Sequence, residues 1–207
     1  MNEKYVINIG RQLGSGGRIV GENLAKTMGI AFYDKELIRI AAQESGLGKE
    51  FFEKADEKTK FGFFGNLFDW FSSHGSEGYM DNYLQNETLF KIQSDVIREL
   101  AEKYSCIFVG RCADYILRDH PLTVNIFICA DMKDRIERII EYEKISPAKA
   151  RDMVDRIDKQ RANYYNYYTG KEWGAASSYH LCINTSMLGI DETAVYVRSF
   201  VEKILKI

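Results

Sequence analysis

The sequence predicts an α/β protein built on a five-stranded parallel sheet with helices on both faces. Five short apolar runs alternate with helical patterns over the 207 residues, and such alternation is typical of parallel sheets. Continuous apolar runs also indicate strands that are buried on both faces. The five runs cover residues 5–9, 30–33, 105–109, 123–129 and 179–183.

Apolar periodicity and capping residues place the helices between these strands. Residues 18–28 repeat apolar side chains on one side, and Gly29 is suited to end that helix in the left-handed conformation. Residues 85–104 carry a clear apolar stripe. Asp131 and Ser146-Pro147 are start signals for helices over 131–144 and from 146 toward 165. Shorter and closing helices are expected at 37–42 and 190–205.

Composition and charge exclude several functional classes. Hydrophobic residues make up 45% and charged residues 28% of the chain, which is enough for a folded core. The formal net charge of -2 gives no global positive field for nucleic acid. No apolar run approaches the roughly 20 residues that span a bilayer, and Met1 leads directly into a strand. We therefore expect a cytoplasmic protein without nucleic-acid or membrane partners, and the sequence does not indicate the oligomeric state.

The cysteine pattern favours reduced thiols. Cys106, Cys112, Cys129 and Cys182 form no CxxC pair, and all but Cys112 lie in apolar runs that predict buried strands. Such cysteines pack as small hydrophobes and are poor candidates for disulfides or a zinc site.

An aromatic segment at residues 58–83 has no clear period. It combines phenylalanines and a tryptophan with Gly, Ser, Asn and Asp. One interpretation is a loop-rich insertion that folds back on the domain, and the other is an aromatic flap over a substrate or a partner surface. The sequence leaves both open.

A glycine-rich loop between the first strand and the first helix predicts phosphate binding. Glycine backbone can approach an anion closely, and the N–H groups and dipole of a helix N-terminus favour negative charge. Arg11 opens the loop and Arg18 lies in the first helical turn, so either can add a charge-assisted hydrogen bond. The predicted nucleotide-binding residues are Gly10, Gly14, Ser15, Gly16, Gly17, Arg18 and Ile19.

The loop departs from the standard GxxxxGK[ST] phosphate loop. With Gly14-Ser15-Gly16 aligned to the usual GxG, Gly17 occupies the place of the lysine, and Arg18 is the candidate substitute. Ser15 is the only hydroxyl in the loop and hence the candidate magnesium ligand.

Several segments resemble the cytidylate kinase-like family over nearly the whole chain. They are Gly14-Ser-Gly-Gly-Arg18 with Gly21, Phe32-Tyr-Asp-Lys-Glu-Leu-Ile38, Val109-Gly-Arg-Cys-Ala-Asp-Tyr-Ile-Leu117, Arg135-Ile-Glu-Arg138 and Asp158-Lys-Gln-Arg161. The resemblance implies a P-loop NTPase-like three-layer sandwich as one domain, residues 1–207. Within it the family places a nucleoside-monophosphate-binding insertion at about 45–84 and a helical lid at about 146–178.

The same resemblance implies ATP-dependent phosphoryl transfer with Mg²⁺ to a nucleoside monophosphate, cytidylate by analogy. Arg111, Asp34 and, with shifted spacing, Arg39 match the acceptor-binding positions. Arg156, Asp158 and Arg161 match the lid residues that clamp the transferred phosphates, and Arg18 completes the predicted catalytic set. Guanidinium groups suit this chemistry because they bind phosphate oxygens in bidentate fashion.

The sequence also fits alternative functions. Gly17 in the lysine position also fits a nucleotide-binding regulatory protein that has kept the fold and lost transfer, and the aromatic segment fits a kinase for another small acceptor. Arg135 and Arg138, with Glu137 and Glu141 nearby, fit a solvated helix face as well as a functional one.

Overall fold

The computed structural model describes residues 3–44, 46 and 79–207. The chain forms two compact units, one made of residues 1–35 and 97–207 and the other of residues 36–96. The second unit contains most of α2 (Lys35–Glu44) and of α5 (Tyr79–Lys103). The aromatic segment 58–83 and the expected insertion at about 45–84 lie largely outside the described residues, so both remain predictions.

The first unit is built on the expected five-stranded parallel sheet. Its strands are β1 (Val6–Arg11), β2 (Ala31–Tyr33), β3 (Cys106–Val109), β4 (Thr123–Cys129) and β5 (Leu181–Asn184). Their order is β2-β3-β1-β4-β5, and all neighbours pair in parallel. The carboxyl ends of β1, β2 and β3 therefore meet at one edge of the sheet. Ligands bind at this edge in open α/β sheets.

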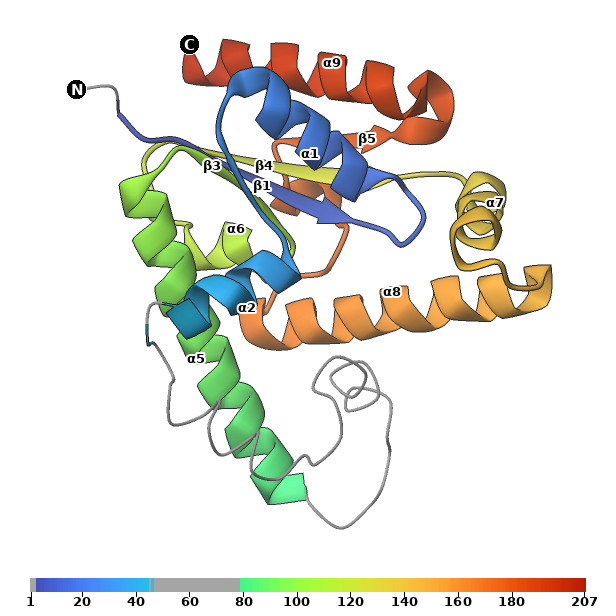
Figure 1. The fold of residues 1–207 in the computed structure, drawn as a ribbon, viewed down its shortest axis with the longest axis horizontal. Coiled ribbons are helices and arrows are strands. Elements are labelled where there is room, and N and C mark those ends of the chain that lie inside the picture. Colours follow the sequence, from blue (N-terminus) through green and yellow to red (C-terminus); the bar gives the residue numbers. More distant parts are fainter. Residues whose placement is uncertain (1–2, 45, 47–78) are drawn as a thin grey trace. The chain divides into compact units, whose positions relative to one another are not determined.

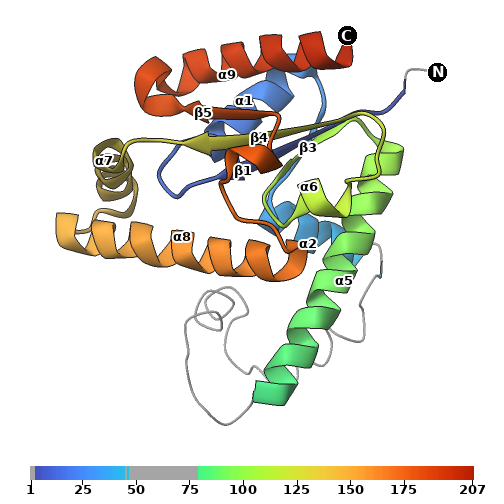
Figure 2. The same ribbon diagram turned by 180° about the vertical axis from the view of Figure 1, so that it is seen from behind.

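Helices cover both faces of this sheet, as expected. Figures 1 and 2 show α1 (Gly17–Met28) and α9 (Thr185–Leu205) on one face, and α6 (Ala113–Ile116) and α8 (Pro147–Thr169) on the other side. The helix α7 (Met132–Glu143) leads into α8, and a 3-10 turn (Ala176–Ser178) precedes β5. Among the described helices, none combines the length and the apolar character that crossing a bilayer requires.

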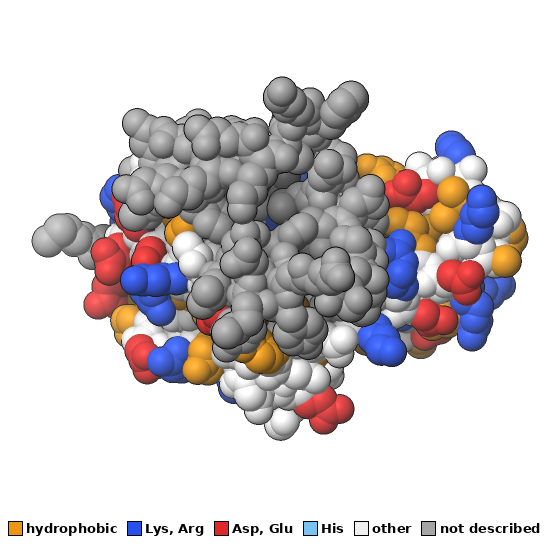
Figure 3. Space-filling view, turned by 90° about the horizontal axis from the view of Figure 1, so that it is seen from below, with side chains coloured by type: hydrophobic (Ala, Val, Ile, Leu, Met, Phe, Trp, Pro, Cys, Tyr) orange, Lys and Arg blue, Asp and Glu red, His pale blue; other side chains and the backbone are white. Residues whose placement is uncertain are grey.

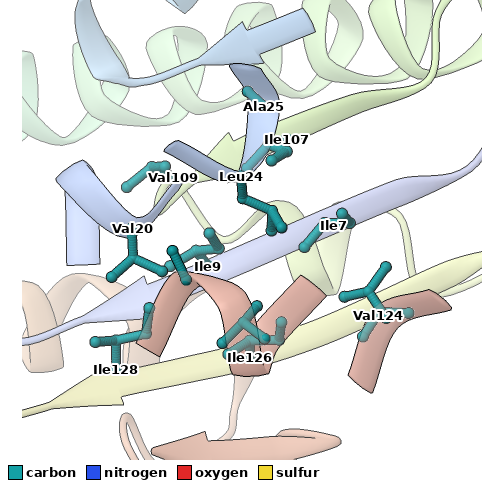
Figure 4. Close-up of a cluster of buried hydrophobic side chains, with 13 residues drawn as sticks. Ile7, Ile9, Val20, Leu24, Ala25, Ile107, Val109, Val124, Ile126 and Ile128 are labelled. Carbon is teal, nitrogen blue, oxygen red and sulfur yellow. The ribbon is translucent and has the colours of Figure 1, made fainter. Parts of the chain in front are cut away.

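A continuous core fixes α1 on the sheet. Val20 and Leu24 of α1 are fully buried and pack with Ile7 and Ile9 of β1 in one cluster (Figure 4). Burying a Val, Leu or Ile side chain stabilises a fold by about 1.5–3 kcal/mol. Because β1 and α1 are anchored in this way, the loop between them has two fixed ends.

The helix boundaries confirm some start and stop signals and correct others. Gly29 caps α1 with a φ of 65°, and the Ser146 side chain accepts a hydrogen bond from the Lys149 amide. The helix α5 begins at Tyr79, six residues before the expected start. Asp131 makes no side-chain cap, because its Oδ1 accepts a hydrogen bond from the Asn184 side chain instead.

The thiols are only partly where the apolar runs predicted. Cys106 and Cys112 are buried, Cys129 is half-buried and Cys182 is exposed. The expectation for Cys182 was wrong because β5 is an edge strand of the sheet. On the face drawn in Figure 3, the visible Lys and Arg side chains of the described residues are interspersed with Asp and Glu side chains.

Candidate functional site

The loop between β1 and α1 takes a backbone path that glycine makes possible. Gly14 and Gly16 have φ angles of 74° and 77°, in the left-handed region that favours glycine. A Cβ on Gly14 would lie 2.6 Å from the Arg135 carbonyl oxygen, and one on Gly16 would lie 2.6 Å from Cδ1 of Ile190. Both positions therefore require glycine for conformation and for space.

Four carbonyl groups of this segment accept hydrogen bonds from side chains of α7, α8 and α9. All four donors lie more than a hundred residues away along the chain. The pairs are Arg11 O with Arg161 Nη1 (3.0 Å), Leu13 O with Arg135 Nε (2.7 Å), Gly14 O with Arg138 Nη1 (3.0 Å) and Ser15 O with Thr185 Oγ1 (2.8 Å). These contacts restrain the orientation of the loop's peptide groups.

Several amide groups of the same segment have no acceptor. Within the described part of the chain, the N–H groups of Gly14, Gly16, Arg18 and Ile19 make no hydrogen bond. The last two belong to the first turn of α1, where N–H groups have no intrahelical partner. Free amides and the positive end of a helix dipole form an anion-binding arrangement.

The side chain of Ser15 points into the interior of the loop to which it belongs. Its side chain is fully buried, and its Oγ donates to the Gln12 carbonyl at 2.8 Å and accepts from the Gly17 amide at 3.3 Å. The hydroxyl thus holds the loop together from inside, and its role as a metal ligand remains a prediction. Across the described residues, no group of three or more His, Cys, Asp or Glu side chains is arranged to hold a metal ion.

Gly10 and Gly17 are positions of close packing. A Cβ on Gly17 would lie 2.6 Å from Cβ of Arg11 and 3.2 Å from Cβ of Ile128, so this position has no room for a lysine. A Cβ on Gly10 would lie 2.8 Å from the Phe127 ring. The structure therefore explains why glycine stands in the place of the usual lysine.

Arg18 and Asp34 are brought together, as ion-pair partners. Arg18 Nε lies 2.9 Å from Asp34 Oδ2, and Nη1 lies 2.7 Å from Glu22 Oε1. The hydrogen bond to Asp34 is the main cause that raises the pKa of Arg18. The Arg18 side chain is 58% exposed, and the neighbouring Ile19 is exposed as well.

Asp158 and Arg161 meet the loop, together with Arg135. Asp158 Oδ1 accepts a hydrogen bond from the Leu13 amide at 2.8 Å, and Oδ2 pairs with Nη2 of the buried Arg135. Burial raises the pKa of Asp158 above its ordinary value, although the Leu13 amide, Arg135 and Arg161 lower it. Burial is also the main cause that lowers the pKa of Arg161.

The other predicted residues are less closely grouped. Arg156 is exposed and lies two residues before Asp158, on a different side of α8. Arg39 belongs to α2, and its side chain is not described.

Arg111 and Arg11 place two further cations at the carboxyl edge of the sheet. Arg111 follows β3, and its guanidinium lies 5.5 Å from the centre of the Tyr164 ring. Within the described residues, neither the guanidinium of Arg11 nor that of Arg111 makes a hydrogen bond or an ion pair. The pKa of Arg11 is lowered to about 9. Burial is the largest cause, and the positive charges of Arg161 and Arg111 add to it.

The sequence did not single out the residues that restrain the loop. In the sequence, Arg135 and Arg138 fit a solvated helix face equally well, and no motif points to Thr185. A signal was present, because Arg135 shares a helix side with the buried Ile139 four residues later.

Comparisons with known proteins find relatives over nearly the whole chain. Residues 6–187 match the model of the cytidylate kinase-like family. A cytidylate kinase from Methanopyrus kandleri is 26% identical over 210 residues, which cover 97% of this chain and 95% of the relative.

Solved structures share the fold. An uncharacterized protein from Eubacterium ventriosum is 27% identical with a TM-score of 0.70, covering 96% of this chain and 99% of that one. A shikimate kinase from Bacteroides thetaiotaomicron has a TM-score of 0.54 at 11% identity, covering 96% and 98% of the two chains, and shows the P-loop kinase fold. The chain therefore belongs to the cytidylate kinase-like family, a family of phosphotransferases.

Proposed function

We propose that this protein transfers a phosphoryl group from ATP to a nucleoside monophosphate, with cytidylate as the first candidate acceptor. The observation that carries the proposal is the set of amide groups at Gly14, Gly16, Arg18 and Ile19, which have no acceptor among the described residues. The cytidylate kinase of Methanopyrus kandleri, related over nearly the full length, supports the choice of acceptor.

The loop suits phosphate because its donors are already oriented. The side chains that bind the carbonyls of residues 11, 13, 14 and 15 keep those oxygens engaged and so restrain the peptide groups of the loop. Donors fixed before the reaction stabilise developing charge without the cost of reorganisation. Phosphoryl transfer needs mainly such positioning and positive charge, since no covalent nucleophile of the protein is involved.

The donor set fits the phosphates of ATP better than it fits a metal ion. The free amides of the loop are donors for the phosphate oxygens of ATP, and the guanidinium of Arg111 suits the phosphate of the acceptor. Mg²⁺ is commonly held by phosphate oxygens, waters and one or two protein groups. With the Ser15 hydroxyl engaged inside the loop, phosphate oxygens and water would supply most of its ligands.

The acceptor roles of Asp34, Arg39 and Arg111 and the lid roles of Arg156, Asp158 and Arg161 are part of this proposal. In the described arrangement Asp158 and Arg161 contact the loop backbone, so they act on phosphate indirectly by holding that backbone. Arg156 is exposed on α8, and its role in the lid rests on the family resemblance alone.

The test is a coupled assay of ADP release with ATP, Mg²⁺ and each common nucleoside monophosphate. We expect turnover with cytidylate above that with adenylate, guanylate and uridylate. Gly14→Val is the matched inactive control, because a side chain at a φ of 74° next to the Arg135 carbonyl distorts the loop. Absence of turnover with every acceptor at high enzyme concentration would contradict the proposal.

A second function is favoured by one observation, the closed space at Gly17. In this alternative, a protein that lacks the lysine binds nucleotide as a regulatory module and transfers no phosphoryl group. Calorimetry that finds tight ATP binding together with zero turnover would select this alternative. Turnover on a non-nucleotide acceptor, found by mass spectrometry of a mixed acceptor pool, would select a kinase for another small molecule.

A further inference from the structure

The last residue of β1, Arg11, presents a partly buried cation without a hydrogen-bonded partner. Its backbone carbonyl is bound by Arg161, but its own guanidinium takes part in none of the hydrogen bonds or ion pairs of the described chain. A partly buried charge without such a partner is unfavourable unless another group compensates it. This cation is therefore available to an anion.

Arg11 occupies the space that a side chain at position 17 would need. A Cβ on Gly17 would meet Cβ of Arg11 at 2.6 Å and its Cγ at 3.3 Å. The space therefore accommodates a long cationic side chain at position 11 or at position 17, but not at both. The chain places it at position 11 and leaves glycine at position 17.

The guanidinium extends from there to the end of the neighbouring strand β3. A Cβ on Gly110 would overlap Nη1 of Arg11 and lie 3.0 Å from its Cζ. Gly110 has a φ of 79° and directly precedes Arg111. The two strands are paired in register, with Ile9 opposite Val109. Arg11 therefore lies between the phosphate loop and the arginine expected at the acceptor phosphate.

Neighbouring charges around Arg11 are mainly of its own sign. Arg161 and Arg111 both lower its pKa, while Asp34 and Asp158 have the smaller, opposite effect. An anion bound among these guanidiniums would relieve their repulsion.

Arg18 is in a different situation. Its side chain is 58% exposed, and its guanidinium already lies within 2.9 Å of two carboxylates, those of Asp34 and Glu22. A cation neutralised by two carboxylates attracts a phosphate less strongly than a cation without a carboxylate partner.

We infer that Arg11 is the phosphate-binding cation of this loop, standing in for the lysine that position 17 has no space to hold. The inference rests on the proposed function, since it assumes that the loop binds phosphate groups. It assigns to Arg11, rather than to Arg18, the main side-chain contact with the phosphate held by the loop.

The test measures binding of inorganic tripolyphosphate and of ATP by titration calorimetry, with thermal melting to confirm folding. Arg11→Gln keeps most of the side-chain volume against Gly17 and removes the charge. We expect it to weaken both ligands by roughly 10- to 150-fold, the effect of losing a hydrogen bond to a charged group. Arg11→Lys should recover part of the affinity, because it restores the charge without the planar fork.

Two further variants separate this inference from the proposed function. Arg18→Ala should weaken binding less than Arg11→Gln, and the control Arg198→Ala, on an exposed pair of α9, should change nothing. Wild-type affinity in Arg11→Gln, or a larger loss in Arg18→Ala, would overturn the inference. If Gly14→Val still abolishes binding in that case, the loop remains the phosphate site and the proposed function stands. A wild-type protein that binds neither ligand would overturn both.

Discussion

Replacing Arg135 by methionine tests whether the buried ion pair beneath the loop holds it in place. Arg135 is 4% exposed, donates to the Leu13 carbonyl at 2.7 Å and pairs with Asp158. Removing one partner of a buried pair costs about 3–5 kcal/mol, because the other charge stays buried. The Asp158 side chain is 15% exposed and keeps some contact with water, so we expect a loss of about 3 kcal/mol.

The measurement is urea unfolding at neutral pH in a double-mutant cycle with Asp158→Leu. The double variant should lose less stability than the sum of the two single variants, with a coupling of about 1–3 kcal/mol. The exposed pair Arg198 and Glu202, at 2.7 Å on α9, is the matched control and should couple by less than about 0.5 kcal/mol. Additive losses for Arg135 and Asp158, within about 0.5 kcal/mol, would refute the reasoning.

Three more predictions follow from other contacts in the first unit. Gly17→Ala should lower the free energy of unfolding by about 1–3 kcal/mol through its clash with Arg11. Adding Arg11→Gly should restore part of that loss, and an additive loss in denaturant unfolding would contradict the packing argument. Ser15→Ala should reduce stability by about 1–3 kcal/mol and leave the Mg²⁺ dependence of ATP binding unchanged. A changed Mg²⁺ dependence in calorimetry would favour the metal role. Burial raises the pKa of Asp114 above 3.8 although the Tyr165 hydroxyl lowers it, so the native state binds the proton more tightly than the unfolded chain. Wild-type stability is therefore lost as pH rises from about 4 through the raised pKa, and Asp114→Asn should gain stability relative to wild type over that window. Unfolding curves with a constant difference across this pH range would contradict it.

The parts of the fold that local sequence determines were predicted well. Buried parallel strands give continuous apolar runs, as in Cys106–Val109, and a glycine cluster between strand and helix marks the loop. Arg111 could be placed at the ligand edge because it directly follows such a strand. An apolar run does not reveal whether its strand lies at the centre or at the edge of the sheet. The run around Cys182 therefore predicted a buried thiol, although β5 is an edge strand and Cys182 is exposed.

The restraints on the loop could not be predicted in the same way. Arg135 and Arg138 donate to carbonyls 122 and 124 residues earlier in the chain. A backbone carbonyl has no residue-specific signal, so nothing at Leu13 or Gly14 indicates an arginine partner. The alternating charges around Asp158 likewise look the same on a solvated helix and on one that supports a binding loop.

The donors to the loop carbonyls also have a consequence for how the site forms during synthesis. The glycine segment is translated first, but the side chains that shape it come from positions 135, 138, 161 and 185. A nascent chain that ends before α9 has the whole glycine motif and only part of its support. Contacts between residues so far apart in the chain close late in folding, because a long loop must be ordered first. We therefore expect the ability to hold an anion to be acquired late in folding, and a fragment that carries only the motif to lack it.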